Sequence, residues 1–465
     1  MIKLYNTLTG KKEALPDAPK LRIFVCGPTV YDRPHIGNAR TFVTFDMFVR
    51  YLRSRKMNVF YLENITDVDD KIIDRAAQER TTWDDVARRY EKIFMDDMKA
   101  LGVIAVDRYA RATDFIPEIV KQVKTLVAKK HAYLIEGDGW YFDLSTFPDY
   151  GKLAHRTAAQ AEDATSRVDS SDRKRNRGDF ALWKFPDPLK HGEPIWQSED
   201  LGAGRPGWHI EDTAITEHFF GPQYDVHGGA IDLKFPHHEA EIAQQESASG
   251  LTPFVKLWMH SGFLMVNGEK MSKSLKNFIT IEDLLRTYSP AIFRMIVFMS
   301  HYRSPLDYTA TLAETAKKNL GTIGAFTAKL KITAQAGGKT AAEADHFKAL
   351  EKDFHAALED DFNTPKALAA VFDHIAKLQK KVWDLPAKEA AGMASGIEDL
   401  FATFGIALET PEIPEKVRRL AEEREQSRGS KHFEQSDRLR KDIEALGYEV
   451  EDTPRGPFLW PRNQI

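Results

Sequence analysis

Hydrophobic and polar positions near the start of the chain follow first a strand pattern and then a helix pattern. The apolar run Leu21–Cys26 contains β-branched residues and ends at a Gly-Pro turn signal, so it predicts a buried strand. Residues 36–55 place their apolar side chains on one helical face, and residues 59–63 predict a second strand. Strand, helix and strand in this order predict a right-handed βαβ unit with a parallel sheet. Ligands of such sheets bind at the carboxyl ends of the strands, here near Cys26 and Asn64.

The pattern changes further along the chain. Residues 84–130 have a helical pattern, whereas 131–206 are rich in Gly, Pro, Asp and Ser and predict an insertion of short strands and loops. Strand-like signals return at His209 and at 224–227, and from Thr311 onward the pattern is helical almost throughout. The sequence therefore predicts an α/β region with an insertion, followed by a helical region.

Composition narrows the class of protein. Hydrophobic residues make up 42% and charged residues 29% of the 465 residues, which is ordinary globular usage and excludes a mostly disordered chain. No run of ~18 apolar residues predicts a membrane helix, and the polar first residues predict no secretion signal. The single cysteine, Cys26, excludes an internal disulfide and suits a reducing compartment, so a cytoplasmic protein is expected. A net charge of −4 means that an RNA partner would need a local basic face.

A first candidate for chemistry is Pro34-His-Ile-Gly-Asn38, between the first strand and the first helix. Backbone N–H groups at a helix N-terminus bind phosphate, and His35 and Asn38 lie on one face of such a helix. Gly37 lacks a Cβ and lets a planar ring approach the backbone. The alternative is a plain helix start with a surface histidine.

A second candidate is the polar segment Lys270-Met-Ser-Lys-Ser274. The lysines Lys270 and Lys273, with two hydroxyls, could close on a triphosphate and stabilise the charge of a departing pyrophosphate. A solvated basic turn is the alternative.

Together these two motifs resemble the class I aminoacyl-tRNA synthetases, and further blocks resemble the cysteinyl-tRNA synthetase family. The further blocks are Val25–Asp32, Asn64–Asp70, Gly204–Glu211, Phe235–Glu239, His301–Ser304 and Asp360–Pro365. The similarity is specific because many unrelated blocks occur in the right order between Leu4 and Pro454.

The resemblance implies an α/β fold: a Rossmann-like parallel-sheet catalytic domain with an insertion, followed by a helical bundle and a small C-terminal domain. The implied divisions are catalytic halves at 1–120 and 204–262, a connective insertion at 121–203, a loop and stem-contact region at 263–310, a tRNA-binding helical bundle at 311–410 and an anticodon-binding domain at 411–465.

The resemblance also implies one zinc ion held by Cys26, Asp212, His237 and Glu241. His237 and Glu241 are four residues apart, so they share a helical face; an exposed, capped helix start is the alternative. Asp212 departs from the family, which usually has cysteine there. A carboxylate can bind zinc, so either Asp212 ligates and makes a harder site, or it does not ligate and the metal is weaker or absent. Asn38, in place of a family histidine, is a second departure.

The remaining site assignments also come from the resemblance. Catalytic roles fall on His35, Asn38, Lys270 and Lys273, and ATP binding on His35, Gly37, Asn38, Gly229, Asp232 and Lys273. Substrate binding falls on Gly27, Thr29, Thr66 and Trp208, although Trp208 could equally be a core tryptophan. Mg²⁺ is expected to accompany ATP.

The charged segment 415–442 predicts a helix with interleaved basic and acidic residues. By charge alone it is a solvated helix; the resemblance implies that it helps bind the anticodon of tRNA-Cys. The expected activity is that of a monomeric ligase that activates L-cysteine with ATP and transfers it to the 3′ end of tRNA-Cys. The alternatives are a cysteine ligase for a small amino-sugar acceptor and an inactive RNA-binding paralogue.

Overall fold

The computed structural model describes residues 1–156, 171–188, 190, 192–271, 275, 277–336 and 346–462. Two compact units divide the chain: the first comprises Met1–Thr287 and Tyr302–Asp307, and the second Tyr288–His301 and Tyr308–Ile465. Among the described residues, no helix has both the length and the apolar character needed to cross a membrane.

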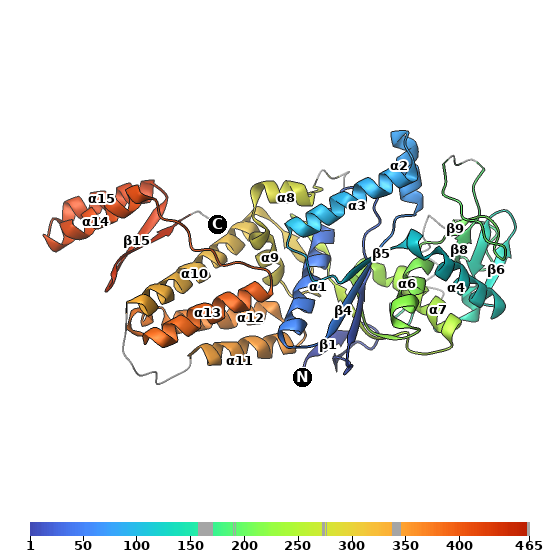
Figure 1. Ribbon diagram of the computed structural model, residues 1–465, viewed down its shortest axis with the longest axis horizontal. Coiled ribbons are helices and arrows are strands. Elements are labelled where there is room, and N and C mark those ends of the chain that lie inside the picture. The colour runs from blue at the N-terminus through green and yellow to red at the C-terminus, as the bar shows by residue number, and fades with distance from the viewer. Residues whose placement is uncertain are drawn as a thin grey trace. The chain divides into compact units, whose positions relative to one another are not determined.

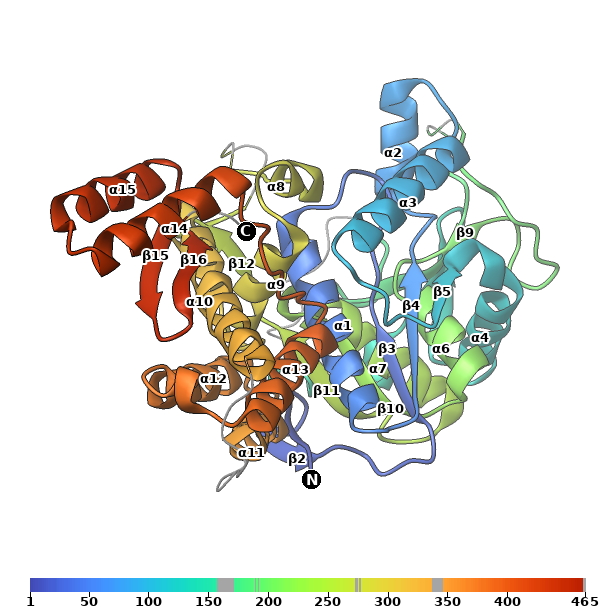
Figure 2. The ribbon, with the colours of Figure 1, turned by 60° about the vertical axis from the view of Figure 1, so that its left-hand side comes forward.

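A five-stranded sheet forms the centre of the first unit (Figure 2). Its strands are β3 (Leu21–Val25), β4 (Val59–Ile65), β5 (Arg108–Arg111), β10 (Tyr224–Ala230) and β11 (Val255–Ser261). The order is β11-β10-β3-β4-β5 and every neighbouring pair is parallel. The predicted βαβ unit is confirmed, because α1 (Ile36–Ser54) connects β3 to its parallel neighbour β4.

Helices cover both faces of this sheet. Gly228 and Gly229 are consecutive on β10 and therefore face opposite ways. A Cβ on Gly228 would lie 2.4 Å from Phe45 of α1, and one on Gly229 would lie 2.8 Å from His238 of α7 (His237–Ser249). The sheet is thus packed between α1 on one face and α7 on the other. The other helices in the described part of this unit are α2 (Asp70–Glu79), α3 (Trp83–Ala100), α4 (Ile116–Ala128), α6 (Ile210–Phe220), α8 (Ile281–Thr287) and the 3-10 helices at Ala112–Phe115, Leu144–Thr146 and Ile231–Lys234.

Two predicted elements of the first unit are wrong. The helical pattern at 84–130 contains strand β5 between α3 and α4; β5 is a short edge strand whose side chains are mostly not buried, so it lacks an apolar run. The strand-like signal at His209 belongs to α6, because nearly every side chain of this helix is buried and its sequence shows no polar face.

The insertion forms a separate antiparallel sheet. Its strands β6 (Ala132–Ile135), β7 (Gly139–Phe142), β8 (Phe180–Lys184) and β9 (Arg205–Pro206) pair in sequence order. Asp70, at the start of α2, accepts charge-assisted hydrogen bonds from Lys184 Nζ at 3.0 Å and Arg205 Nη2 at 2.7 Å. These contacts join the insertion to α2, close to Trp208, which follows β9.

Short strands complete the first unit. They are β1 (Lys3–Asn6) with β2 (Lys11–Ala14), and β12 (Leu264–Val266), β13 (Glu269–Lys270) and β14 (Leu306–Tyr308) in the order β13-β12-β14. The buried Arg40 of α1 donates from Nη1 to the carbonyl oxygens of Gly262 at 2.8 Å and Phe263 at 2.5 Å. Arg40 therefore fixes the segment that leads into β12 and β13.

Helices dominate the second unit (Figure 1). They are α9 (Pro290–Phe298), α10 (Ala310–Gln335), α11 (His346–Glu359), α12 (Thr364–Leu378), α13 (Ala387–Thr403), α14 (Glu415–Gly429), α15 (Phe433–Ala445) and a 3-10 turn at Val382–Asp384. The single helix predicted at 415–442 is wrong, because the chain turns between α14 and α15, where Lys431 has φ +62°. The hairpin of β15 (Tyr448–Thr453) and β16 (Gly456–Pro461) also interrupts the predicted helical pattern.

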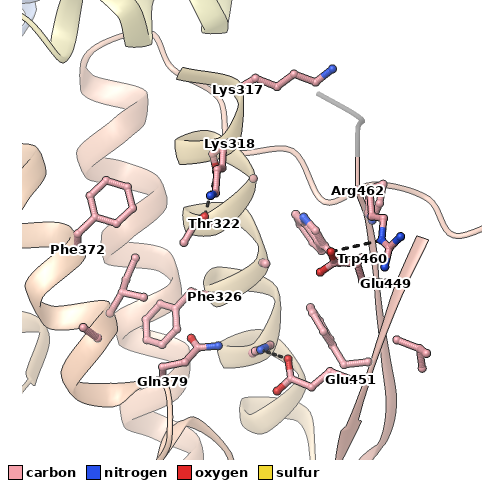
Figure 3. A pocket seen from close by; sticks show the side chains of 18 of the residues that line it. Lys317, Lys318, Thr322, Phe326, Phe372, Gln379, Glu449, Glu451, Trp460 and Arg462 are labelled. Atoms are coloured by element: carbon pink, nitrogen blue, oxygen red, sulfur yellow. Dashed lines mark hydrogen bonds and ion pairs between the residues drawn. The ribbon is translucent and has the colours of Figure 1, made fainter. Parts of the chain in front are cut away.

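The terminal hairpin packs against α10, beside a cavity of about 920 Å³ within the second unit (Figure 3). Lys329 of α10, only 3% exposed, forms an ion pair with Glu451 and places its Nζ 5.0 Å from the ring centre of Phe458. Trp460 lies over Gly324, where a Cβ would come within 3.1 Å of the indole. The absence of a side chain at Gly324 therefore lets the hairpin approach the helix closely.

Candidate functional site

A pocket of about 450 Å³ opens at the carboxyl end of the parallel sheet. It lies where the strand order reverses, with β10 on one side of β3 and β4 on the other, which is where ligands of such sheets bind. Most of the predicted site residues line it. They are Cys26, Gly27, Thr29, His35, Gly37, Asn38, Thr66, Trp208, Asp212, Asp232, His237 and Lys270.

Two predicted site residues are not on the pocket wall, and a third cannot be placed. Gly229 lies on β10 and faces His238. Glu241 is buried one helical turn after His237, behind the wall. Lys273 lies outside the described residues, so the structure gives no position for it.

The four predicted metal ligands come together in one buried cluster. One donor atom from each of Cys26, Asp212, His237 and Glu241 lies within 4.8 Å of all the others. The Cys26 Sγ is 3.4 Å from Asp212 Oδ2 and 3.8 Å from Glu241 Oε1. His237 Nε2 is 2.9 Å from Asp212 Oδ2 and 3.0 Å from Glu241 Oε1. The alternative of an exposed helix start is wrong, because the His237 side chain is only 3% exposed.

The electrostatics of this cluster fit a bound cation. Burial raises the pKa of the Cys26 thiol well above its usual value, and Glu241 and Asp212 raise it further. Burial also raises the pKa of Glu241, and the neighbouring Asp212 adds to the effect. Glu241 Oε2 accepts no hydrogen bond although it is buried. Two carboxyl groups and a thiol are costly to bury together without a positive charge, and a thiolate, imidazole and carboxylates are typical donors for zinc.

A second set of donors, not predicted from the sequence, surrounds the same thiol. His227 Nε2 lies 3.3 Å and His238 Nε2 3.2 Å from Cys26 Sγ, and Glu241 completes this set. His238 is three residues before Glu241 on α7, so the helical spacing contained a signal for it. No spacing links His227 of β10 to α7, and only the fold brings them together.

The end of the pocket next to Cys26 contains both aromatic and polar groups. Trp208 stacks on His237, with ring centres 4.5 Å apart, and it lines the pocket rather than the core. Thr66 donates from Oγ1 to Glu211 Oε1 at 3.0 Å. A Cβ on Gly27 would lie 1.8 Å from the Asn64 carbonyl oxygen, so only glycine fits beside β4 at that point.

The first turn of α1 forms the other end of the pocket. His35 is the N-cap, and its Nδ1 accepts hydrogen bonds from the N–H groups of Gly37 at 3.1 Å and Asn38 at 3.3 Å. Burial lowers the pKa of His35, with Asp232 and Asp32 opposing that effect. A neutral ring with Nδ1 as acceptor carries its proton on Nε2, so His35 offers a neutral N–H donor. The exposed Lys270 of β13 adds a cation to the same wall.

Comparisons with known proteins agree with this geometry. Residues 14–318 match the family described as tRNA synthetases class I (C) catalytic domain, and residues 353–409 match the DALR domain family. The cysteine–tRNA ligase of Thermococcus gammatolerans is 41% identical and that of Methanococcus maripaludis strain S2 is 40% identical, each over 100% of both chains. The cysteine–tRNA ligase of Coxiella burnetii strain RSA 493 is 38% identical over 98% of both chains.

Solved structures show a similar fold. Methionyl-tRNA synthetase of Mycobacterium tuberculosis bound by methionyl-adenylate has a TM-score of 0.63 at 15% identity, over 83% of this chain and 92% of that one. The crystal structure of a putative arginyl-tRNA synthetase from Campylobacter jejuni has a TM-score of 0.60 at 13% identity, over 84% and 94%. At identities this low, the solved structures show only that the fold is similar. The matches over the whole length of the curated relatives show the activity and favour a tRNA ligase over an amino-sugar ligase. With a parallel sheet that ends in a buried thiol, imidazole and carboxylate cluster, this chain belongs to the cysteine–tRNA ligases, which are class I aminoacyl-tRNA synthetases.

Proposed function

We propose that the chain forms cysteinyl-adenylate from L-cysteine and ATP in the pocket at the carboxyl end of the parallel sheet and then transfers the cysteinyl group to the 3′ end of tRNA-Cys. The cysteine carboxylate attacks the α-phosphate of ATP, and pyrophosphate leaves. A ribose hydroxyl of the terminal adenosine of the tRNA then attacks the acyl carbon of the adenylate, and AMP leaves. The protein's task is to position the reactants and to stabilise charge. The observation that carries the proposal is the cluster of buried metal-binding side chains at the base of the pocket. The first turn of α1 forms the opposite wall.

Cys26, Asp212, His237 and Glu241 would hold a zinc ion at the base of the pocket. Bound there, zinc supplies a Lewis acid that prefers the sulfur of cysteine to the hydroxyl of serine. Trp208 and Thr66 would form the walls around the amino acid, and Gly27 and Thr29 would border its backbone. With one protein thiolate and two carboxylates the site is harder than a site with two thiolates, so we expect a smaller preference for cysteine over serine.

The nucleotide would lie along the first turn of α1. His35 Nε2 would donate to a phosphate oxygen without adding a charge, since burial lowers its pKa. Asn38 would add a neutral donor, Lys270 and Lys273 would add positive charge, and Gly37 and Asp232 would form the surface against the adenosine. Mg²⁺ would accompany the phosphates.

The second unit would bind the RNA. The bundle α10–α13 and the terminal segment α14–β16 would position tRNA-Cys mainly through its phosphates, with bases read by polar and aromatic groups. The match to cysteine–tRNA ligases over 100% of the chain, which includes the second unit, supports this role.

The test is ATP–pyrophosphate exchange without tRNA. Labelled pyrophosphate should enter ATP only when cysteine is present. Lys273→Ala should slow this exchange by about 10²–10³-fold, the cost of removing one electrostatic donor from a transition state. Exchange that does not depend on cysteine would overturn the proposal.

A further inference from the structure

The replacement of a thiol by a carboxylate at position 212 raises a physical problem. A zinc-bound cysteine uses its single sulfur, whereas Asp212 brings two oxygens, and its side chain is buried. The Oδ2 atom faces Cys26 and His237. The Oδ1 atom needs a hydrogen-bond donor of its own. Without one it would be a buried, unpaired acceptor, which would lower the stability of the folded chain.

Asn64 of β4 supplies that donor. Its Nδ2 donates to Asp212 Oδ1 at 2.5 Å, and the Asn64 side chain is itself buried. The orientation of the amide is defined by its other end, because the backbone N–H of Gly27 donates to Asn64 Oδ1 at 2.6 Å. An N–H group can donate only to the oxygen, so Nδ2 must face Asp212.

We infer that Asn64 is a positioning residue that makes Asp212 a one-oxygen substitute for a thiolate, an inference that rests on the proposed zinc site. By holding Oδ1, the amide leaves only Oδ2 to face the donors of Cys26 and His237. It also links three parts of the site, since the same amide anchors Gly27 next to Cys26. Hydrogen bonds of this kind to metal-binding side chains fix their orientation and raise metal affinity.

A double-mutant cycle distinguishes a positioning role of Asn64 from a general structural role. The full-length protein and its variants Asn64→Ala, Asp212→Cys and Asn64→Ala/Asp212→Cys are titrated with zinc against a chelating chromophore. Asn64→Ala should weaken zinc binding about 10–100-fold when Asp212 is present. Combined with Asp212→Cys, which leaves no second oxygen to orient, Asn64→Ala should change the affinity by no more than about twofold, the scatter of independent sites.

A matched variant separates the two hydrogen bonds of the amide. Asn64→Asp has the same shape and keeps the acceptor for Gly27, but it loses the donor and places a second carboxylate beside Asp212. It should weaken zinc binding at least as much as Asn64→Ala. Thermal unfolding of each variant with and without zinc shows whether the chain is folded. Any general loss of structure caused by Asn64→Ala lowers the zinc affinity equally in both backgrounds and therefore cancels in the cycle.

X-ray absorption at the zinc edge provides a readout that does not depend on activity. The expected spectrum of the cysteine-free protein has one sulfur and one imidazole; two imidazoles would place zinc on His227 and His238 and overturn the inference. An unchanged zinc affinity in Asn64→Ala or Asn64→Asp would also overturn it. So would an equal loss of zinc affinity when Asn64→Ala is made in the unmodified protein and in Asp212→Cys. Failure of the proposed function is seen separately, as cysteine-independent exchange by the unmodified protein.

Discussion

At the scale of single residues, a buried histidine near Cys26 makes the stability of the folded chain sensitive to acid. His260 of β11 is buried between Thr7 and His238: its Nδ1 lies 2.8 Å from Thr7 Oγ1, and its Nε2 lies 2.8 Å from His238 Nδ1. Burial lowers the pKa of His260 to about 3. Folding therefore keeps this ring neutral under conditions where an unfolded chain would protonate it.

The pKa of His260 gives a prediction about stability and pH. Between pH ~6.5 and ~3 the unfolded chain binds a proton that the folded chain does not, so the free energy of unfolding falls as the pH falls through this window. When the pH falls from 7.5 to 5.5, His260 should lower the free energy of unfolding by about 1 kcal/mol. Urea unfolding of the unmodified protein and of His260→Gln at both pH values measures it. The variant should lose less stability on acidification, and equal losses would contradict the prediction.

At the scale of elements, one glycine of α10 controls how closely the terminal hairpin approaches. A Cβ at Gly324 would meet the Trp460 indole at 3.1 Å, whereas one at Gly321, a turn earlier, would lie 3.8 Å from it. Gly324→Leu should therefore displace Trp460 and loosen β15 and β16. Gly321→Ala is the matched control, since it makes an ordinary contact and gains up to about 1 kcal/mol of helix propensity.

Hydrogen–deuterium exchange over residues 448–461 measures the attachment of the hairpin. We expect faster exchange in Gly324→Leu and no acceleration in Gly321→Ala. If both variants exchange at the rate of the unmodified protein, Trp460 does not hold the hairpin on α10.

At the scale of the whole molecule, the pocket lies entirely within the first compact unit, whereas the terminal segment belongs to the second. Pro411 and Pro414 lie just before α14, outside any helix or strand. A chain truncated near Thr410 should retain cysteine-dependent pyrophosphate exchange nearly unchanged and charge tRNA-Cys more weakly. Initial rates of both reactions for the full and truncated chains measure this, and equal charging by the two would show that the terminal segment is no RNA-binding module.

Local patterns were enough to locate β3, α1 and β4, because an apolar run and a helical stripe are properties of neighbouring residues. They failed where burial came from elsewhere: α6 buries polar and apolar side chains alike and so shows no helical stripe, and β5 is a strand mainly through its pairing with β4. The order of motifs identified Cys26, Asp212, His237 and Glu241 as candidates. Their assembly within 4.8 Å depends on strands and helices that are far apart in the chain.

Only the tertiary structure placed the Asn64 amide against Asp212 and His227 beside Cys26. Hydrogen bonds and metal sites depend on ångström distances between side chains, and sequence spacing gives such distances only within one helix or strand. Asn64 and Asp212 are separated by 148 positions, yet the adjacent β3 and β4 and the packed helix α6 bring their polar atoms to 2.5 Å. The family and its chemistry could be predicted from ordered motifs, whereas the way in which this chain accommodates a carboxylate in place of a thiolate was decided by packing.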